Sequence, residues 1–227
     1  MTIETSTITL RTVDGHELSA YRAAPPKPAG SVVVLQEIFG VNQHIREVAD
    51  GYAREGYVAI APALFDRVER GVDLGYDAEA VARGRELREA VGWRGALLDV
   101  QAAINAAQES GPVAVIGYCW GGSLAFVAAA RLIGLECAVG YYGAQTLPFA
   151  QEEVHVPVML HFGELDPHLP PEDIEAIRSG NPEIEIHVFP ADHGFNCNHR
   201  KAWHAESAER ALALTLGFLR KHLVQTA

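Results

Sequence analysis

Short apolar runs alternate with helical patterns along most of this 227-residue chain. The runs SVVVLQE at 31–37 and PVAVIGY at 112–118 are almost free of polar residues. Such runs are typical of parallel strands that are buried on both faces. Stretches with apolar residues at helical spacing separate successive runs. The alternation predicts an α/β fold, in which helices cover both faces of a mostly parallel sheet.

The N-terminal segment departs from this pattern. TITLRTV at 7–13 and ELSAYRA at 17–23 alternate apolar and polar residues around the turn DGH, which predicts an antiparallel hairpin. Asn42 is expected to cap a helix that ends before Gly56. We expect one domain over residues 1–227. The other predicted elements are strands over 57–62, 137–143, 156–163 and 184–190, and helices over 78–91, 94–109, 120–133 and 199–222.

The charge balance and the cysteine content exclude several classes of protein. Eighteen basic against 29 acidic residues give a net charge of -11, and no basic tract stands out. We therefore expect neither nucleic acid nor a membrane as partner. The sequence shows no signal peptide pattern, and its three cysteines are too few for a disulfide framework. A cytoplasmic protein, monomeric or a small homo-oligomer, is the expectation.

A cysteine flanked by glycines follows the strand pattern of 112–118, in the sequence GYCWGG. A sharp strand-to-helix turn of the form G-x-nucleophile-x-G lifts its central side chain above the edge of the sheet. Gly117 and Gly121 would let the chain bend tightly there, and the N-terminus of the following helix would favour a thiolate at Cys119. Free cysteines are also common as small buried apolar residues, so this motif alone leaves both interpretations open.

An acid and a histidine occur in the order that this kind of site requires. Asp166 and His193 each lie in a polar loop after a predicted strand, downstream of Cys119. The chemistry needs His193 to move the thiol proton and Asp166 to orient the imidazole. Asp192 and Glu164 are weaker candidates for the acid, because adjacent side chains such as Asp192 and His193 rarely face each other.

Four motifs give the chain a resemblance to the dienelactone hydrolase family of α/β-hydrolases. They are QEIFG at 36–40, GYCWGG at 117–122, HFGELD at 161–166 and DHGF at 192–195. The resemblance covers nearly the whole length. It implies the α/β-hydrolase fold and a Cys–Asp–His triad that acts on enol-lactones or related esters without a cofactor.

The motif QEIFG acquires a role from this resemblance. It implies that Glu37 contacts the resting thiol and accepts its proton when the substrate binds. It also implies that the backbone N–H groups of Ile38 and Trp120 stabilise the oxyanion. Phe39 is a candidate for the lining of the substrate pocket.

Substrate binding is less constrained by the sequence. The resemblance implies two arginines that hold a substrate carboxylate, one before the nucleophile and one after the histidine. Arg83 and Arg85 are alternatives for the first, and spacing does not choose between them. For the second, Arg200 lies further along the chain than the family pattern requires, so it either substitutes or the second arginine is absent.

The segment HGFNCNHRKAWH gathers histidines and a cysteine, which are typical zinc ligands. Its spacings match no usual zinc signature, and we expect no metal. The candidate ligands in that segment are His193, Cys197, His199 and His204.

Three functions are compatible with the motif around Cys119. The first is a cysteine hydrolase of activated esters, through a thioester intermediate. The second is a glutamine amidotransferase, but the chain lacks the histidine and glutamate two residues apart that such enzymes carry. The third is a non-catalytic thiol-sensing or ligand-binding protein.

Overall fold

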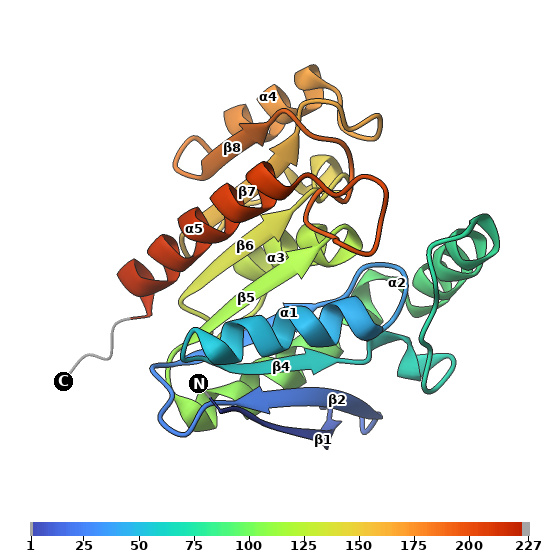
Figure 1. The fold of residues 1–227 in the computed structure, drawn as a ribbon, viewed down its shortest axis with the longest axis vertical. Helices are drawn as coiled ribbons and strands as arrows, with labels where there is room; N and C mark the ends of the chain where they lie inside the picture. The colour runs from blue at the N-terminus through green and yellow to red at the C-terminus, as the bar shows by residue number, and fades with distance from the viewer. Residues whose placement is uncertain (1, 224–227) are drawn as a thin grey trace.

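A computed structural model describes residues 2–223 (Figure 1). Within them, eight strands form one sheet in the order β1-β2-β4-β3-β5-β6-β7-β8. The strands are β1 Glu4–Arg11, β2 Glu17–Ala24, β3 Ser31–Leu35, β4 Val58–Pro62, β5 Val113–Tyr118, β6 Cys137–Tyr141, β7 Val158–Gly163 and β8 Glu185–Phe189. The helices are α1 Gln43–Arg54, α2 Ala78–Ala107, α3 Trp120–Arg131, α4 Pro171–Gly180 and α5 Ala205–His222.

The pairing of the strands confirms the predicted fold class. β1 pairs with β2, and β2 with β4, in antiparallel orientation. All the other pairs are parallel, from β4 and β3 across to β7 and β8. The parallel strands β3 and β5 are buried along their whole length, as their apolar runs predict.

Helices cover both faces of this sheet. Helices α1 and α5 lie on the face toward the viewer in Figure 1, and α3 lies behind the sheet. Alternate residues of one strand therefore enter different cores. Val32 and Val34 of β3 pack with residues of α1 and α5, whereas Val33 and Leu35 pack with residues of α2, α3 and α4.

The helix boundaries confirm most predictions and correct one. The Asn42 side chain accepts a hydrogen bond from the Ile45 N–H (3.2 Å) and caps α1. Helix α2 is broken at Gly92 (φ 64°), between the two predicted segments. The helix predicted over 199–222 begins only at Ala205, because residues 199–204 form a turn-rich loop, and the His204 side chain caps the helix. No helix among the described residues has the length and apolarity needed to cross a membrane.

Candidate active site

Cys119 lies at the turn where β5 ends and α3 begins. Its backbone has φ 54° and ψ -116°, a left-handed conformation that costs a residue with a side chain about 1–3 kcal/mol. The turn requires glycine on both sides. A Cβ atom on Gly117 would lie 1.8 Å from the carbonyl oxygen of Gly121, and one on Gly121 would lie 2.5 Å from that of Leu35. The backbone therefore holds Cys119 in a strained position at the carboxyl edge of the sheet.

The structure brings Asp166 and His193 to this cysteine. The Nδ1 atom of His193 is 2.7 Å from Oδ2 of Asp166, and its Nε2 atom is 3.2 Å from Sγ of Cys119. Asp166 follows β7, and its other carboxylate oxygen accepts a hydrogen bond from the His168 N–H (2.9 Å). The three side chains form one continuous row of hydrogen bonds, with the imidazole in the middle.

The weaker candidates for the acid, Asp192 and Glu164, do not contact the imidazole of His193. Asp192 is exposed, and its carboxylate accepts a hydrogen bond from the backbone N–H of His193 (2.6 Å), not from the ring. Glu164 is exposed and makes no side-chain hydrogen bond with a described residue. Only Asp166, of these three acids, is paired with the imidazole.

The row of hydrogen bonds shifts the pKa values of its members. Burial alone would lower the pKa of His193, but its interactions with Cys119 and with Asp166 raise it to about 10. Burial opposes ionisation of Asp166, but its hydrogen bond with His193 and the nearby charge hold the pKa of the carboxyl below its usual value. Its contacts with Cys119 and Asp166 therefore stabilise the protonated form of His193 against the effect of burial.

Glu37 lies directly after β3 and is 1% exposed. Its Oε1 atom is 3.4 Å from Nη1 of Arg200, whose guanidinium group also lies over the rings of Phe39 (5.7 Å) and Tyr76 (5.8 Å). Burial raises the pKa of Glu37, and the charges of Arg200 and His193 oppose this only in part. Glu37 is thus a buried carboxyl group with raised proton affinity beside the row that ends at Cys119.

A cavity of 610 Å³ opens above the sulfur atom. Cys119 and His193 line it, together with Ile38, Phe39 and Trp120. The backbone N–H groups of Ile38 and Trp120 donate no hydrogen bond to any acceptor among the described residues. Two N–H donors therefore remain available at the wall of the cavity that contains the thiol.

The predicted arginines divide between the cavity and the surface. Arg85 and Arg200 line the cavity. Arg83 lies outside it, paired with Glu69 and with Glu86 (3.1 Å). Of the two alternatives that spacing left open, Arg85 is therefore the one that lines the cavity.

Sequence reasoning missed one arginine of the cavity. Arg88 lies on the same helix as Arg85 and lines the same space. Residues three apart on a helix share one face, so this spacing could have identified it.

Comparisons with known proteins place this geometry in a family context. The family described as the dienelactone hydrolase family matches residues 18–223. The carboxymethylenebutenolidase of Pseudomonas putida is 33% identical over 227 residues, which cover 95% of this chain and 96% of that protein. A Yersinia pestis protein assigned as a carboxymethylenebutenolidase is 36% identical over 230 residues, which cover 92% of this chain and 85% of that protein.

Solved structures show the same relation. A crystal structure of a Klebsiella pneumoniae protein assigned as a dienelactone hydrolase superposes with a TM-score of 0.86. It is 29% identical, and the match covers 97% of this chain and all of that one. The esterase Pf2001 of Pyrococcus furiosus shares the fold at a TM-score of 0.73 and 17% identity, over 97% of this chain and 93% of that one.

Proposed function

The chain belongs to the dienelactone hydrolase family, and from this premise we propose that it hydrolyses activated carboxylic esters, enol-lactones such as dienelactone foremost, with Cys119 as the nucleophile. Membership of this family makes the chain a hydrolase of ester or lactone bonds. The observation that carries the finer proposal is the row Asp166–His193–Cys119, with distances of 2.7 and 3.2 Å, at the wall of a cavity.

The proposed reaction has two steps. The Cys119 thiolate attacks the carbonyl carbon of the lactone, and the ring opens to a thioester as an enolate leaves. The enolate takes up the proton of the His193 imidazolium, which becomes a neutral imidazole. Neutral His193 then removes a proton from water, which hydrolyses the thioester to the carboxylic acid and restores the pair of thiolate and imidazolium. Asp166 holds the imidazole in orientation and stabilises its charged form in both steps.

Glu37 has a role before the first step. It accepts the proton of Cys119 and leaves a thiolate paired with the His193 imidazolium. Its raised pKa supports this role, because a carboxylate with high proton affinity is a better base near neutral pH.

The developing negative charge on the carbonyl oxygen is stabilised by two backbone donors in this proposal. The N–H groups of Ile38 and Trp120 are free to donate, and both residues line the cavity. Trp120 is also the first residue of α3, so the helix dipole favours an anion at this position. Removing one such donor costs other enzymes about 10²–10³-fold in rate.

The arginines suggest the charge of the substrate. Arg85, Arg88 and Arg200 line one cavity in a chain whose net charge is -11. A local group of cations within an acidic protein suits a substrate that carries a carboxylate. We therefore propose carboxylated enol-lactones as preferred substrates, with Phe39 and Trp120 contacting their apolar part.

A hydrolysis screen with acid quench tests the proposal. Enol-lactones and aryl esters, each with and without a carboxylate, are incubated with the full chain, and quenched samples are digested for peptide mass measurement. We expect faster turnover of carboxylated lactones and an acyl adduct on the peptide that contains Cys119. Turnover that leaves no adduct on this peptide, together with full activity of Cys119→Ala, would refute the proposed nucleophile.

A further inference from the structure

A second group of buried titratable side chains lies outside the row of Asp166, His193 and Cys119. It consists of Glu37, His44 and Cys197, which are 1%, 3% and 0% exposed. Glu37 follows β3, His44 belongs to the first turn of α1, and Cys197 lies in the loop between β8 and α5. One ligand atom from each side chain lies within 4.8 Å of the other two. Three distant segments thus bring a carboxylate, an imidazole and a thiol together.

Three polar atoms of this group have no hydrogen-bond partner among the described residues. Oε2 of Glu37 and both ring nitrogens of His44 are buried without a hydrogen bond to any described residue. The Cys197 thiol donates a hydrogen bond to the Tyr76 hydroxyl (3.4 Å). A buried polar atom without a partner costs about 1–3 kcal/mol, so three such atoms at one place are expensive unless a ligand satisfies them.

We propose that Glu37, His44 and Cys197 bind one zinc ion. Carboxylate oxygen, imidazole nitrogen and thiolate sulfur are the donors that zinc takes in proteins, and three protein ligands leave a fourth position for water. Two anionic ligands balance the charge of the ion. Glu37 can bind the ion and keep its contact with Arg200, because Oε1 contacts Arg200 and Oε2 has no partner among the described residues.

The distances require only a small adjustment. Zinc–ligand bonds of about 2.0–2.3 Å place neighbouring atoms of a tetrahedral site about 3.3–3.8 Å apart. The three atoms, within 4.8 Å of one another, must therefore approach by about 1 Å. Rotation of the side chains supplies a movement of this size.

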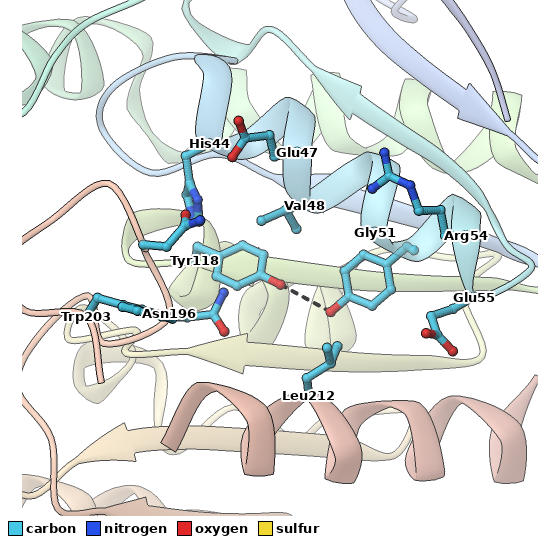
Figure 2. Close-up of a pocket in the computed structure, with 12 residues that line it drawn as sticks. His44, Glu47, Val48, Gly51, Arg54, Glu55, Tyr118, Asn196, Trp203 and Leu212 are labelled. Carbon is cyan, nitrogen blue, oxygen red and sulfur yellow. Dashed lines mark hydrogen bonds between the residues drawn. The ribbon is translucent and has the colours of Figure 1, made fainter. Parts of the chain in front are cut away.

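A separate cavity connects His44 with solvent (Figure 2). It has a volume of 380 Å³ and is lined by His44, Glu47 and Tyr118 on one side and by Asn196 and Trp203 of the loop on the other. Figure 2 shows that His44 and Glu47 project from α1 at the same end of this cavity. Exposed Glu47 is hydrogen-bonded to His199 (2.7 Å), whose ring centroid is 5.7 Å from that of His44. An ion can therefore approach His44 from the face of the sheet that α1 and α5 cover.

Zinc at this site would inhibit the hydrolase. Glu37 bound to zinc could no longer accept the proton of Cys119. This consequence rests on the proposed function, whereas the binding of the ion does not. We expect zinc to lower kcat and to leave KM for the lactone nearly unchanged, because the substrate cavity stays open.

The binding test uses the full chain and zinc alone. Equilibrium dialysis after removal of metals should give one zinc per chain, and cobalt in its place should show thiolate-to-cobalt charge transfer. Cys197→Ser should abolish the charge transfer band and weaken binding at least about 10-fold, as should His44→Gln. If His44→Gln does not fold, Cys197→Ser decides alone.

Two control variants separate this site from its neighbours. Cys119→Ser removes the thiol of the active site, and His199→Ala removes the exposed histidine near His44; both should still bind one zinc with the charge transfer band. Loss of the ion in Cys119→Ser but not in Cys197→Ser would assign it to the active site and overturn the proposal. Loss of zinc in His199→Ala but not in Cys197→Ser would assign the ion to the surface. If the wild-type chain binds no zinc, the proposal is wrong. Binding without inhibition would instead contradict the role of Glu37.

Discussion

Two groups of side chains near the carboxyl edge of the sheet contain the same three chemical functions. Asp166, His193 and Cys119 form a row in which the imidazole has a hydrogen-bonding neighbour on each side, at 2.7 and 3.2 Å. Glu37, His44 and Cys197 lie within 4.8 Å of one another but form no hydrogen bonds among themselves. A row of partners suits proton transfer, whereas converging atoms without partners suit a cation. The arrangement, not the residue types, separates the two chemistries.

The two histidines show the electrostatic side of this difference. Interactions with Cys119 and Asp166 overcome burial and raise the pKa of His193 to about 10. Burial, with the charge of His199, lowers the pKa of His44 to about 4. The neighbours of His193 therefore favour its protonated form, whereas burial keeps His44 a neutral imidazole at neutral pH.

The largest expected effect concerns the sulfur of the row. Cys119→Ala should lower kcat/KM for a lactone by about 10⁴-fold or more, because no other nucleophile in the row can form the thioester. Steady-state kinetics on an enol-lactone measures it. Cys137→Ala is the matched control, since Cys137 is buried in β6 away from the cavity, and it should stay within about threefold of wild type. Equal losses in both variants would point to a general effect on folding.

The next effect concerns the carboxylate of the row. Asp166→Asn should lower kcat by about 10³–10⁴-fold, because the amide no longer stabilises the charged imidazole and favours the wrong tautomer. Asp192→Asn, one position before His193, should change kcat by less than about threefold, because Asp192 accepts only a backbone hydrogen bond. A larger loss in Asp192→Asn than in Asp166→Asn would reverse the assignment of the acid.

The row was predictable from the sequence because parallel strands bring their carboxyl ends to one edge. Once β5, β7 and β8 are recognised as strands, Cys119, Asp166 and His193 must lie close together at that edge. The strained turn at Cys119 was readable from its glycines, which the structure shows to be sterically required. Local patterns thus determine this part of the molecule.

The second group was not predictable, because tertiary contacts place it. The sequence pattern predicts a helix from residue 199, but α5 begins at Ala205, and the preceding loop brings Cys197 to Tyr76. His44 follows two other polar residues, Asn42 and Gln43, at the start of α1, and no local pattern marks it as buried. The metal ligands considered from the sequence were neighbours along the chain, whereas the structure joins Cys197 to residues more than 150 positions away.

A third histidine, His161, is expected to have an effect of intermediate size on the free energy of unfolding. It tests whether burial keeps an imidazole neutral. His161 of β7 is 0% exposed, and burial, with the charge of His187, lowers its pKa to about 3. The folded value lies below the unfolded value of about 6.5, so its contribution to stability is intact above pH 6.5 and is lost as pH falls toward 3. At pH 5 the loss from this residue is about 2 kcal/mol, or about 30-fold in the unfolding equilibrium.

Urea unfolding at pH 7 and pH 5 measures this loss. The decrease in the free energy of unfolding between the two pH values should be about 2 kcal/mol smaller in His161→Gln than in wild type. His155→Gln replaces an exposed histidine and should leave the decrease unchanged. Equal decreases in wild type and His161→Gln would show that His161 takes up its proton in the folded state as readily as in the unfolded state.

The smallest expected effect is a change in KM that depends on the charge of the substrate. It should occur at the active site and leave zinc binding by the second group unchanged. Arg85 lines the cavity above Cys119, whereas Arg83, two residues earlier, is paired with Glu69 and Glu86 outside it. Arg85→Gln should raise KM for a carboxylated lactone by about 10-fold, the worth of one charge-assisted contact, and leave KM for a neutral lactone and zinc binding unchanged. Arg83→Gln should change none of these. An equal rise in KM for the charged and the neutral lactone would mean that Arg85 shapes the cavity without binding a carboxylate. A change in zinc binding would mean that Arg85 also influences the second group, although Arg85 and His44 line different cavities.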